Sequence, residues 1–290
     1  MGLRKVVLAV VVGLATLFIR PAVADPGEPC SLWERQVYAI TTTGGLVEHG
    51  FCLEANRTVS RWAGERVVAT SGWGEVSQAF WSGTVHGTGV YYRVDAGVLQ
   101  WSSDLQSWQR IGAWIDWSTV TSLTSAEPGV IYGTEPSGKV RKWVHLGWQD
   151  GTDTWGRTSV VGTLPPASAL LGQTRDGFIG IDGTGLGDVV HVWPEGFATT
   201  SFRISVPPGV ERGRLVPFDL QQRYPNSAFA LTSAGRLALL LPVKCEKLDR
   251  AWRADDETGG GYRQIFAGGY VEHGTGPVEW QCTGPGKPGN

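Results

Sequence analysis

The sequence predicts an all-β fold, a five-bladed β-propeller of four-stranded blades, and three observations point to it. The first is a tight hairpin at residues 90–101, in which two runs with apolar residues flank a turn that contains Gly97. The second is the recurrence of that hairpin along the chain. The third is composition: 41 glycines, 14 tryptophans and 18% charged residues suit short strands joined by many turns, with aromatic side chains between the sheets.

The hairpin pattern has three marks: an aromatic residue, a glycine six positions later, and leucine or valine eight positions later. Glycine at this position supplies the positive φ that a tight hairpin turn requires. Four strict copies and one looser copy start 41 to 53 residues apart. They are Tyr38-Gly44-Leu46, Tyr91-Gly97-Leu99, Tyr132-Gly138-Val140, Phe229-Gly235-Leu237 and, with two extra residues, the looser Ile179-Gly185-Val189.

Each repeat holds four strand candidates in about 45 to 50 residues, the size of one propeller blade. A single four-stranded sheet cannot bury both of its apolar faces, so the blades are expected to stack around an axis and to close a ring. The first unit lacks the strand that precedes the hairpin elsewhere. We expect the tail segment 271–282, through its run 277–280, to pair there. Before it, the fifth unit should contain a polar loop, an outer strand at 262–266 and a turn at 268–270.

The first residues have the pattern of a secretory signal peptide. Arg4 and Lys5 precede an uncharged, mostly apolar run at 6–19, and Ala22-Val23-Ala24 is a small-x-small cleavage site. The run is short for a membrane span, although a retained signal anchor is the alternative. We therefore expect a secreted, extracellular protein with a signal peptide at 1–24, a lead-in segment at 25–35, the propeller at 36–282 and a flexible tail at 283–290.

All four cysteines, Cys30, Cys52, Cys245 and Cys282, lie in the exported part. An even number in a secreted chain predicts two disulfides, and four cysteines allow three pairings. In a closed ring Cys30 and Cys282 would meet where the first and last units join, which leaves Cys52 to pair with Cys245. The local pairing of Cys30 with Cys52 stays open. A bond that closes so long a loop contributes about 3–5 kcal/mol if it is unstrained.

Charge and the remaining motifs argue against several classes of function. Removal of residues 1–24 leaves 22 basic and 27 acidic residues without a basic stripe, so we expect neither nucleic-acid binding nor membrane insertion. The five histidines show no metal-ligand spacing, and no G-x-S-x-G turn occurs. We therefore expect no metal, no cofactor and no catalytic residues, in a protein that is a monomer.

The order aromatic, glycine and leucine, followed by Trp and by Ile-Gly-x-Trp, resembles the repeat of the tachylectin-2-type five-bladed propeller lectins. The clearest copy runs from Gly89 to Ile111-Gly112-Ala113-Trp114, and the resemblance covers most of residues 36–282. It implies multivalent binding of N-acetylated hexosamines in shallow pockets between blades, each beside a Gly-Gly-Trp-like turn. Such turns are Gly72-Trp73, Gly112-Ala113-Trp114 and Gly268-Gly269-Tyr270. The turns at 162–164 and 207–209 lack the aromatic residue, so two or three sites are expected.

The residue types themselves allow sugar binding. An aromatic ring can cover the apolar C–H face of a sugar, while backbone N–H groups and short polar side chains bind its hydroxyls. The alternative for each tryptophan is a wedge packed between blades, which we expect for Trp62, Trp108 and Trp155. Two other functions suit the same scaffold. One is a protein-interaction propeller, and the other is a glycoside hydrolase with axial carboxylates, for which the candidates are Glu75, Asp116, Asp219 and Glu279.

Overall fold

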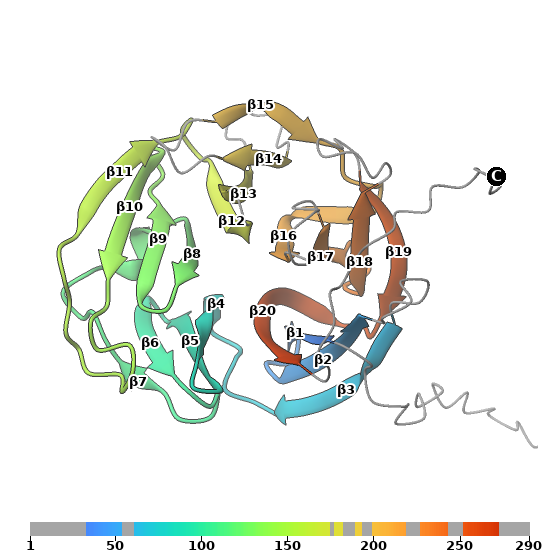
Figure 1. Ribbon diagram of the computed structural model, residues 1–290, viewed down its shortest axis with the longest axis horizontal. Helices are drawn as coiled ribbons and strands as arrows, with labels where there is room; N and C mark the ends of the chain where they lie inside the picture. Colours follow the sequence, from blue (N-terminus) through green and yellow to red (C-terminus); the bar gives the residue numbers. More distant parts are fainter. Residues whose placement is uncertain are drawn as a thin grey trace, which may run out of the picture.

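The computed structural model describes residues 33–53, 61–174, 177–181, 189–192, 199–218, 227–242 and 252–272. Within these residues the protein is an all-β propeller, in which five four-stranded antiparallel sheets surround a central axis (Figure 1). Each sheet runs from an inner strand near the axis to an outer strand at the periphery. One short 3₁₀ helix, η1 (Trp117–Thr119), precedes the third sheet.

The sheets are numbered in chain order, and their strands are given from the axis outward. The first sheet holds β20 (Tyr262–Glu272), β1 (Trp33–Thr41), β2 (Leu46–Leu53) and β3 (Arg61–Ala69). The second holds β4 (Val76–Val85), β5 (Thr88–Asp95), β6 (Val98–Ser102) and β7 (Gln109–Arg110). The third holds β8 (Ser122–Glu127), β9 (Val130–Thr134), β10 (Lys139–Val144) and β11 (Ser159–Thr163). The fourth holds β12 (Ala169–Thr174), β13 (Gly177–Ile181), β14 (Val189–Val192) and β15 (Thr199–Ile204), and the fifth β16 (Val210–Phe218), β17 (Ser227–Thr232), β18 (Leu237–Pro242) and β19 (Trp252–Thr258).

The hairpin repeat predicted the middle pair of strands in every sheet. These pairs, all antiparallel, are β1 with β2, β5 with β6, β9 with β10, β13 with β14 and β17 with β18. The repeat glycines that the structure describes have the expected positive φ, which is +83° at Gly44, +79° at Gly97, +84° at Gly138 and +69° at Gly235. The hairpin prediction is confirmed at these four turns, and Gly185 lies outside the described residues.

The last described strand joins the end of the chain to the first sheet. β20 pairs with β1 along its length, from Glu272 opposite Trp33 to Tyr262 opposite Thr41. The expected partner of β1 was therefore assigned to the wrong segment, and residues 277–280 lie outside the described ranges. The error has a local cause: the acidic stretch 252–258, expected to be a loop, forms the outer strand β19, so 262–266 belongs to an inner strand instead. The inner strands contact one another in the order β20, β4, β8, β12, β16 and back to β20.

Gly268 and Gly269 lie inside β20, so the prediction of a turn at 268–270 is wrong. The register with β1 shifts here, because Tyr270 is opposite Arg35 while Ala267 is opposite Val37. A Cβ atom on Gly268 would come within 2.6 Å of the Tyr38 ring. Glycine is thus required for the close approach of β1 at a bulge. The chain turns instead at 259–261, where the first and third glycines have positive φ.

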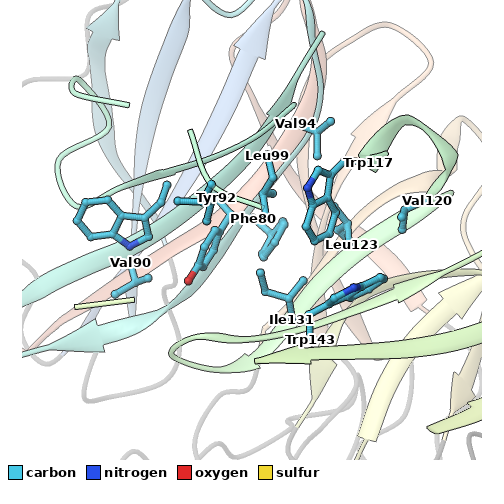
Figure 2. Packing of buried hydrophobic residues seen from close by; sticks show 12 residues of the cluster. Phe80, Val90, Tyr92, Val94, Leu99, Trp117, Val120, Leu123, Ile131 and Trp143 are labelled. Atoms are coloured by element: carbon cyan, nitrogen blue, oxygen red, sulfur yellow. The ribbon is translucent and has the colours of Figure 1, made fainter. Parts of the chain in front are cut away.

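The core within the described residues is divided into five buried apolar clusters, one at each junction between neighbouring sheets. Figure 2 shows the cluster between the second and third sheets, where Phe80 and Tyr92 lie beside Trp117 and Trp143. The rings of Phe80 and Tyr92 stack at 5.3 Å, and those of Trp117 and Trp143 lie 5.2 Å apart. Burial of each side chain of this kind contributes about 1.5–3 kcal/mol, so the tryptophan-rich junctions hold the sheets in fixed relative positions.

Cys52 in β2 is buried and disulfide-bonded. The other three cysteines lie outside the described residues, so the pairing stays a prediction. β1 begins at Trp33, inside the segment 25–35 expected to be a lead-in. In the part of the chain that the structure describes, there is no helix of the length and apolarity needed to cross a bilayer.

Candidate functional site

The first of the three expected binding turns lies between β3 and β4, and its tryptophan is buried. Trp73 has an exposed fraction of 1%. Its ring stacks on Phe266 of β20 at 5.8 Å and meets the edge of Trp108 at 5.4 Å. Gly72 is exposed and has a φ of +88°. The turn has the expected shape, but the ring it carries is a wedge between the first and second sheets.

Arg93 of β5 covers this wedge. Its guanidinium carbon lies 5.0 Å from the centre of the Trp73 ring and 4.2 Å from that of Trp108. Nη1 donates to the carbonyl oxygen of Gly72 at 3.1 Å, and Nε donates to Oε1 of Gln100 at 2.7 Å. Burial lowers the pKa of Arg93 from its ordinary value, an effect that Asp95 opposes. The protein's own cation thus occupies the space between the two tryptophan faces.

The second expected turn, between β7 and β8, leaves its tryptophan on the surface. Trp114 has an exposed fraction of 61%. Gly112 begins the turn with a φ of +61°, and its carbonyl accepts the N–H of Ile115 at 3.0 Å. Trp117, three residues further on, is the buried wedge here: the N–H of Val120 donates to its carbonyl, just as the N–H of Val76 donates to that of Trp73. Trp114 is therefore an additional aromatic residue that the packing of the sheets does not use.

A loop from the third sheet supplies the second half of this site. The ring of Trp155 lies 6.1 Å from that of Trp114 at 88°, so the two rings are perpendicular. Asp153 is exposed, and its Oδ1 accepts both the N–H of Gly112 at 2.6 Å and Nε1–H of Trp155 at 2.5 Å. No hydrogen bond within the described residues involves Oδ2 of Asp153. One carboxylate oxygen therefore fixes both the turn and the ring.

The ring of His145 packs against the ring of Trp155. The two rings lie 4.9 Å apart at 32°, and His145 is fully buried. Nε2 lies 2.8 Å from the carbonyl oxygen of Thr152, which can only accept, so Nε2 carries the proton and Nδ1 accepts the hydroxyl of Tyr92 at 2.9 Å. Burial lowers the pKa of His145 below its ordinary value, against the opposing effects of the Thr152 carbonyl, Asp153 and Asp150. The folded protein therefore favours the neutral form of the His145 ring.

The structure thus brings together two of the seven sequence-predicted binding residues, Gly112 and Trp114. Gly72 and Trp73 lie in the covered turn, and Gly268, Gly269 and Tyr270 lie in the inner strand β20. Asp153, Trp155 and His145 were not predicted as site residues. Trp155 was expected to be a wedge, and its partly buried ring does pack against the cluster between the second and third sheets, 6.0 Å from the ring of Trp117. The one sequence feature that pointed to these residues was the long connection between β10 and β11, and the sequence does not reveal which way this loop folds.

The axis of the propeller holds a cavity of about 710 Å³ lined by the inner strands. The carboxylates proposed for a hydrolase are not gathered there. Glu75 lies exposed in the turn before β4, and Asp116 caps η1 by accepting the N–H of Ser118. Asp219 and Glu279 lie outside the described residues. The charged residues of the described lining are Arg35, Arg214, Arg263 and Glu127. Nowhere in the described ranges do three or more histidine, cysteine, aspartate or glutamate side chains gather as a metal site.

Comparison with known proteins identifies no family for this chain. No protein-family model matches the chain, and no curated protein matches it. Among solved structures, a similar chain is PorZ, described as an essential bacterial surface component of the type-IX secretion system of Porphyromonas gingivalis. The match has a TM-score of 0.40 and 15% sequence identity, and it covers 79% of this chain. The chain spans about a quarter of the length of PorZ, 25% of that chain.

Proposed function

We propose that this protein is a secreted lectin of the tachylectin-2 type, whose five sheets are the blades of a ring closed by β20, and that it binds N-acetylated hexosamines between its second and third blades. The site consists of Trp114 and Gly112 from the turn before β8, with Trp155 and Asp153 from the loop after β10. The sugar is the ligand, and no cofactor takes part. The observation that carries the proposal is the exposed ring of Trp114, perpendicular to the partly buried ring of Trp155, which is anchored by the Asp153 carboxylate.

The exposed face of Trp114 suits the C–H face of a pyranose ring. Trp114 is 61% exposed, so its apolar ring is in unfavourable contact with water. It does not fill a junction between sheets as Trp73 and Trp117 do, which are both 1% exposed. A flat aromatic ring held from one side offers apolar area with little loss of side-chain freedom when a ligand binds. Sugar binding accounts for its place on the surface.

The surroundings of Trp114 favour an acetamido group. The perpendicular Trp155 ring presents a second apolar surface against which an acetyl methyl group can pack. Oδ2 of Asp153 can accept the acetamido N–H or a ring hydroxyl, while Oδ1 stays bound to Gly112 and Trp155. A charged acceptor makes stronger hydrogen bonds than a neutral one, so the bond to Asp153 would fix the orientation of the sugar in the shallow site.

The number of sites differs from the two or three that the repeat implied. Trp73 is buried, and the segment 268–270 lies within β20 and forms no turn, which leaves the exposed ring of Trp114 at the turn 112–117. We therefore propose one site per chain at these turns. Gains from multivalency would then require several chains on one surface.

The test is a glycan array and titration calorimetry with the purified, oxidised protein. We expect binding to glycans that end in N-acetylglucosamine or N-acetylgalactosamine, and a loss of about tenfold or more in affinity in Trp114→Ala, which corresponds to about 1.4 kcal/mol. Val67→Ala is the matched control, because Val67 is a similarly exposed apolar residue in β3, where it is 59% exposed. Binding that survives Trp114→Ala would exclude this site, and a folded protein that binds no glycan would overturn the lectin proposal in favour of a protein partner.

A further inference from the structure

The axial cavity carries a positive charge on one side of its wall. Arg214 lies on β16, Arg263 on β20 and Arg35 on β1, which is paired with β20. β16 and β20 are neighbouring inner strands, so Arg214 and Arg263 share one part of the wall. Arg35 is opposite Tyr270, seven residues further along β20 than Arg263, and lies toward the other end of the cavity. This bias does not follow from the composition of the chain, since the part after residue 24 has 22 basic and 27 acidic residues.

Two of these arginines lie at nearly the same height along the axis. Leu215 of β16 and Ile265 of β20 pair with the same position of the hairpin repeat, the residue after its first aromatic. Arg214 directly precedes Leu215, and Arg263 lies two residues before Ile265. The two guanidinium groups therefore start from adjacent strands within about one residue of the same level, a rise of roughly 3.3 Å.

The rest of the wall at this level is small and uncharged. The positions equivalent to Arg214 in β4, β8 and β12 are Ala79, Ser122 and Ala169, and all three line the cavity. The one carboxylate among the described lining residues, Glu127, ends β8 five residues beyond Ser122. The small residues leave the space in front of the arginines open. Among the described acidic residues, Glu211 forms an ion pair with Arg214 from the same strand.

Both arginines are held in place with donors to spare. Arg263 uses Nη2 alone, which donates to the carbonyl oxygens of Trp73, Gly74 and Val76, at 3.0 Å for Gly74 and 3.1 Å for Val76. Arg214 uses Nε, which lies 2.9 Å from Oε2 of Glu211. Within the described residues, Nε and Nη1 of Arg263 and both Nη atoms of Arg214 make no hydrogen bond.

Arg35 is a third positive charge in the cavity wall, at the other end of β20 from Arg263. It is 3% exposed, and its guanidinium carbon lies 5.0 Å from the centre of the Trp81 ring. A cavity with walls of low dielectric constant and charge of one sign concentrates counter-ions. Arginine donors match the oxygens of phosphate, sulfate and carboxylate groups in pairs.

We propose that the axial cavity is a binding site for a tetrahedral oxyanion, a sulfate or phosphate group, held between Arg214 and Arg263. The site is separate from the turn of Trp114, and it does not depend on the lectin proposal. The group can arrive as a free ion or as the sulfate or phosphate of a sugar, because the cavity of about 710 Å³ has room for either.

The experiment measures sodium sulfate and sodium phosphate binding by titration calorimetry and by the unfolding midpoint, against sodium chloride at equal ionic strength. Sulfate also raises unfolding midpoints through its exclusion from protein surfaces, so the decisive quantity is the difference between variants. We expect Arg214→Gln to weaken oxyanion binding about tenfold. Its midpoint in chloride should stay close to that of the wild type, because the Arg214 side chain is 41% exposed.

Arg110→Gln is the control, since Arg110 is exposed on the outer strand β7. It and Trp114→Ala should bind sulfate as the wild type does. Glucose 6-sulfate, titrated alongside, separates the two sources of the group: tighter binding than free sulfate identifies a sugar ester, and weaker binding identifies the free ion. Absence of binding heat in the wild type would overturn the proposal, as would equal sulfate stabilisation of wild type and Arg214→Gln.

Discussion

The turns at 72–76 and 112–117 have similar sequences and opposite exposure. Both begin with a glycine of positive φ, at Gly72 and Gly112, and both carry a tryptophan soon after it. Trp73 is 1% exposed, whereas Trp114 is 61% exposed. One turn is an internal wedge, and the other presents an aromatic surface to solvent.

The position of each tryptophan in the sequence, relative to the valine that follows the turn, accounts for this difference. Trp73 lies three residues before Val76, and Trp117 lies three residues before Val120, with the same backbone hydrogen bond in each case. A tryptophan at that position is directed into the junction between two sheets. Trp114 lies three residues earlier still, so its ring falls outside the junction. At these two turns, the buried tryptophan is therefore the one three residues before the valine that donates to its carbonyl, whatever its distance from the glycine that opens the turn.

The largest expected effect is on stability at the buried turn. Trp73→Ala removes a ring that contacts Phe266, Trp108 and Arg93, and it should lower the free energy of unfolding by about 3–5 kcal/mol. Trp114→Ala should change it by less than about 0.5 kcal/mol, as is usual for exposed residues. Urea unfolding of the two variants side by side measures both values. Equal losses would mean that the exposed ring also holds the sheets together.

The sequence predicted the elements that depend on local chemistry. The hairpin glycines and the apolar runs around them specify β5 and β6, as well as their counterparts in the other sheets, because a tight turn and period-two burial are both set by neighbouring residues. The same reasoning failed at the C-terminal end of the fold. There an acidic outer strand, β19, reads as a loop. The two glycines of β20 read as a turn, although Gly268 in fact leaves room for the Tyr38 ring.

The site was predictable only in part, because it joins two sheets. Trp114 could be found from its turn. The contacts of Asp153 and Trp155 with that turn depend on how the loop after β10 folds back across the junction, which no local pattern specifies. The arginines of the cavity were missed for a related reason. Only the register of β16 and β20 places Arg214 and Arg263 together, and single-strand patterns carry no register between sheets.

A smaller effect is expected from the cation that covers the buried turn. Arg93→Met keeps an unbranched side chain of similar length between Trp73 and Trp108 but removes the guanidinium contacts and the hydrogen bond to the carbonyl of Gly72. We expect the free energy of unfolding to fall by about 1–3 kcal/mol. Arg110→Met, on an exposed outer strand, is the control. A neutral result for Arg93→Met would show that the two tryptophans close the turn without the cation.

The last difference between the two turns is their response to acid. Arg93, at the turn 72–76, stays charged throughout. At the turn 112–117, Trp114 contacts Trp155, whose ring packs on His145. Burial lowers the pKa of His145 below the ordinary value of 6.5. Between the lowered folded pKa and 6.5 the unfolded chain binds more protons, so the contribution of His145 is complete above pH 6.5 and is lost as the pH falls through the folded pKa. His145→Gln keeps an amide that can donate to Thr152 and removes the titration. As the pH falls below 6.5, the unfolding free energy of the wild type should therefore decline more steeply than that of His145→Gln. His49, whose pKa burial lowers to about 4, contributes with the same sign in both proteins and cancels in the comparison. Parallel pH profiles of the two proteins would show that the titration of His145 does not change the unfolding free energy.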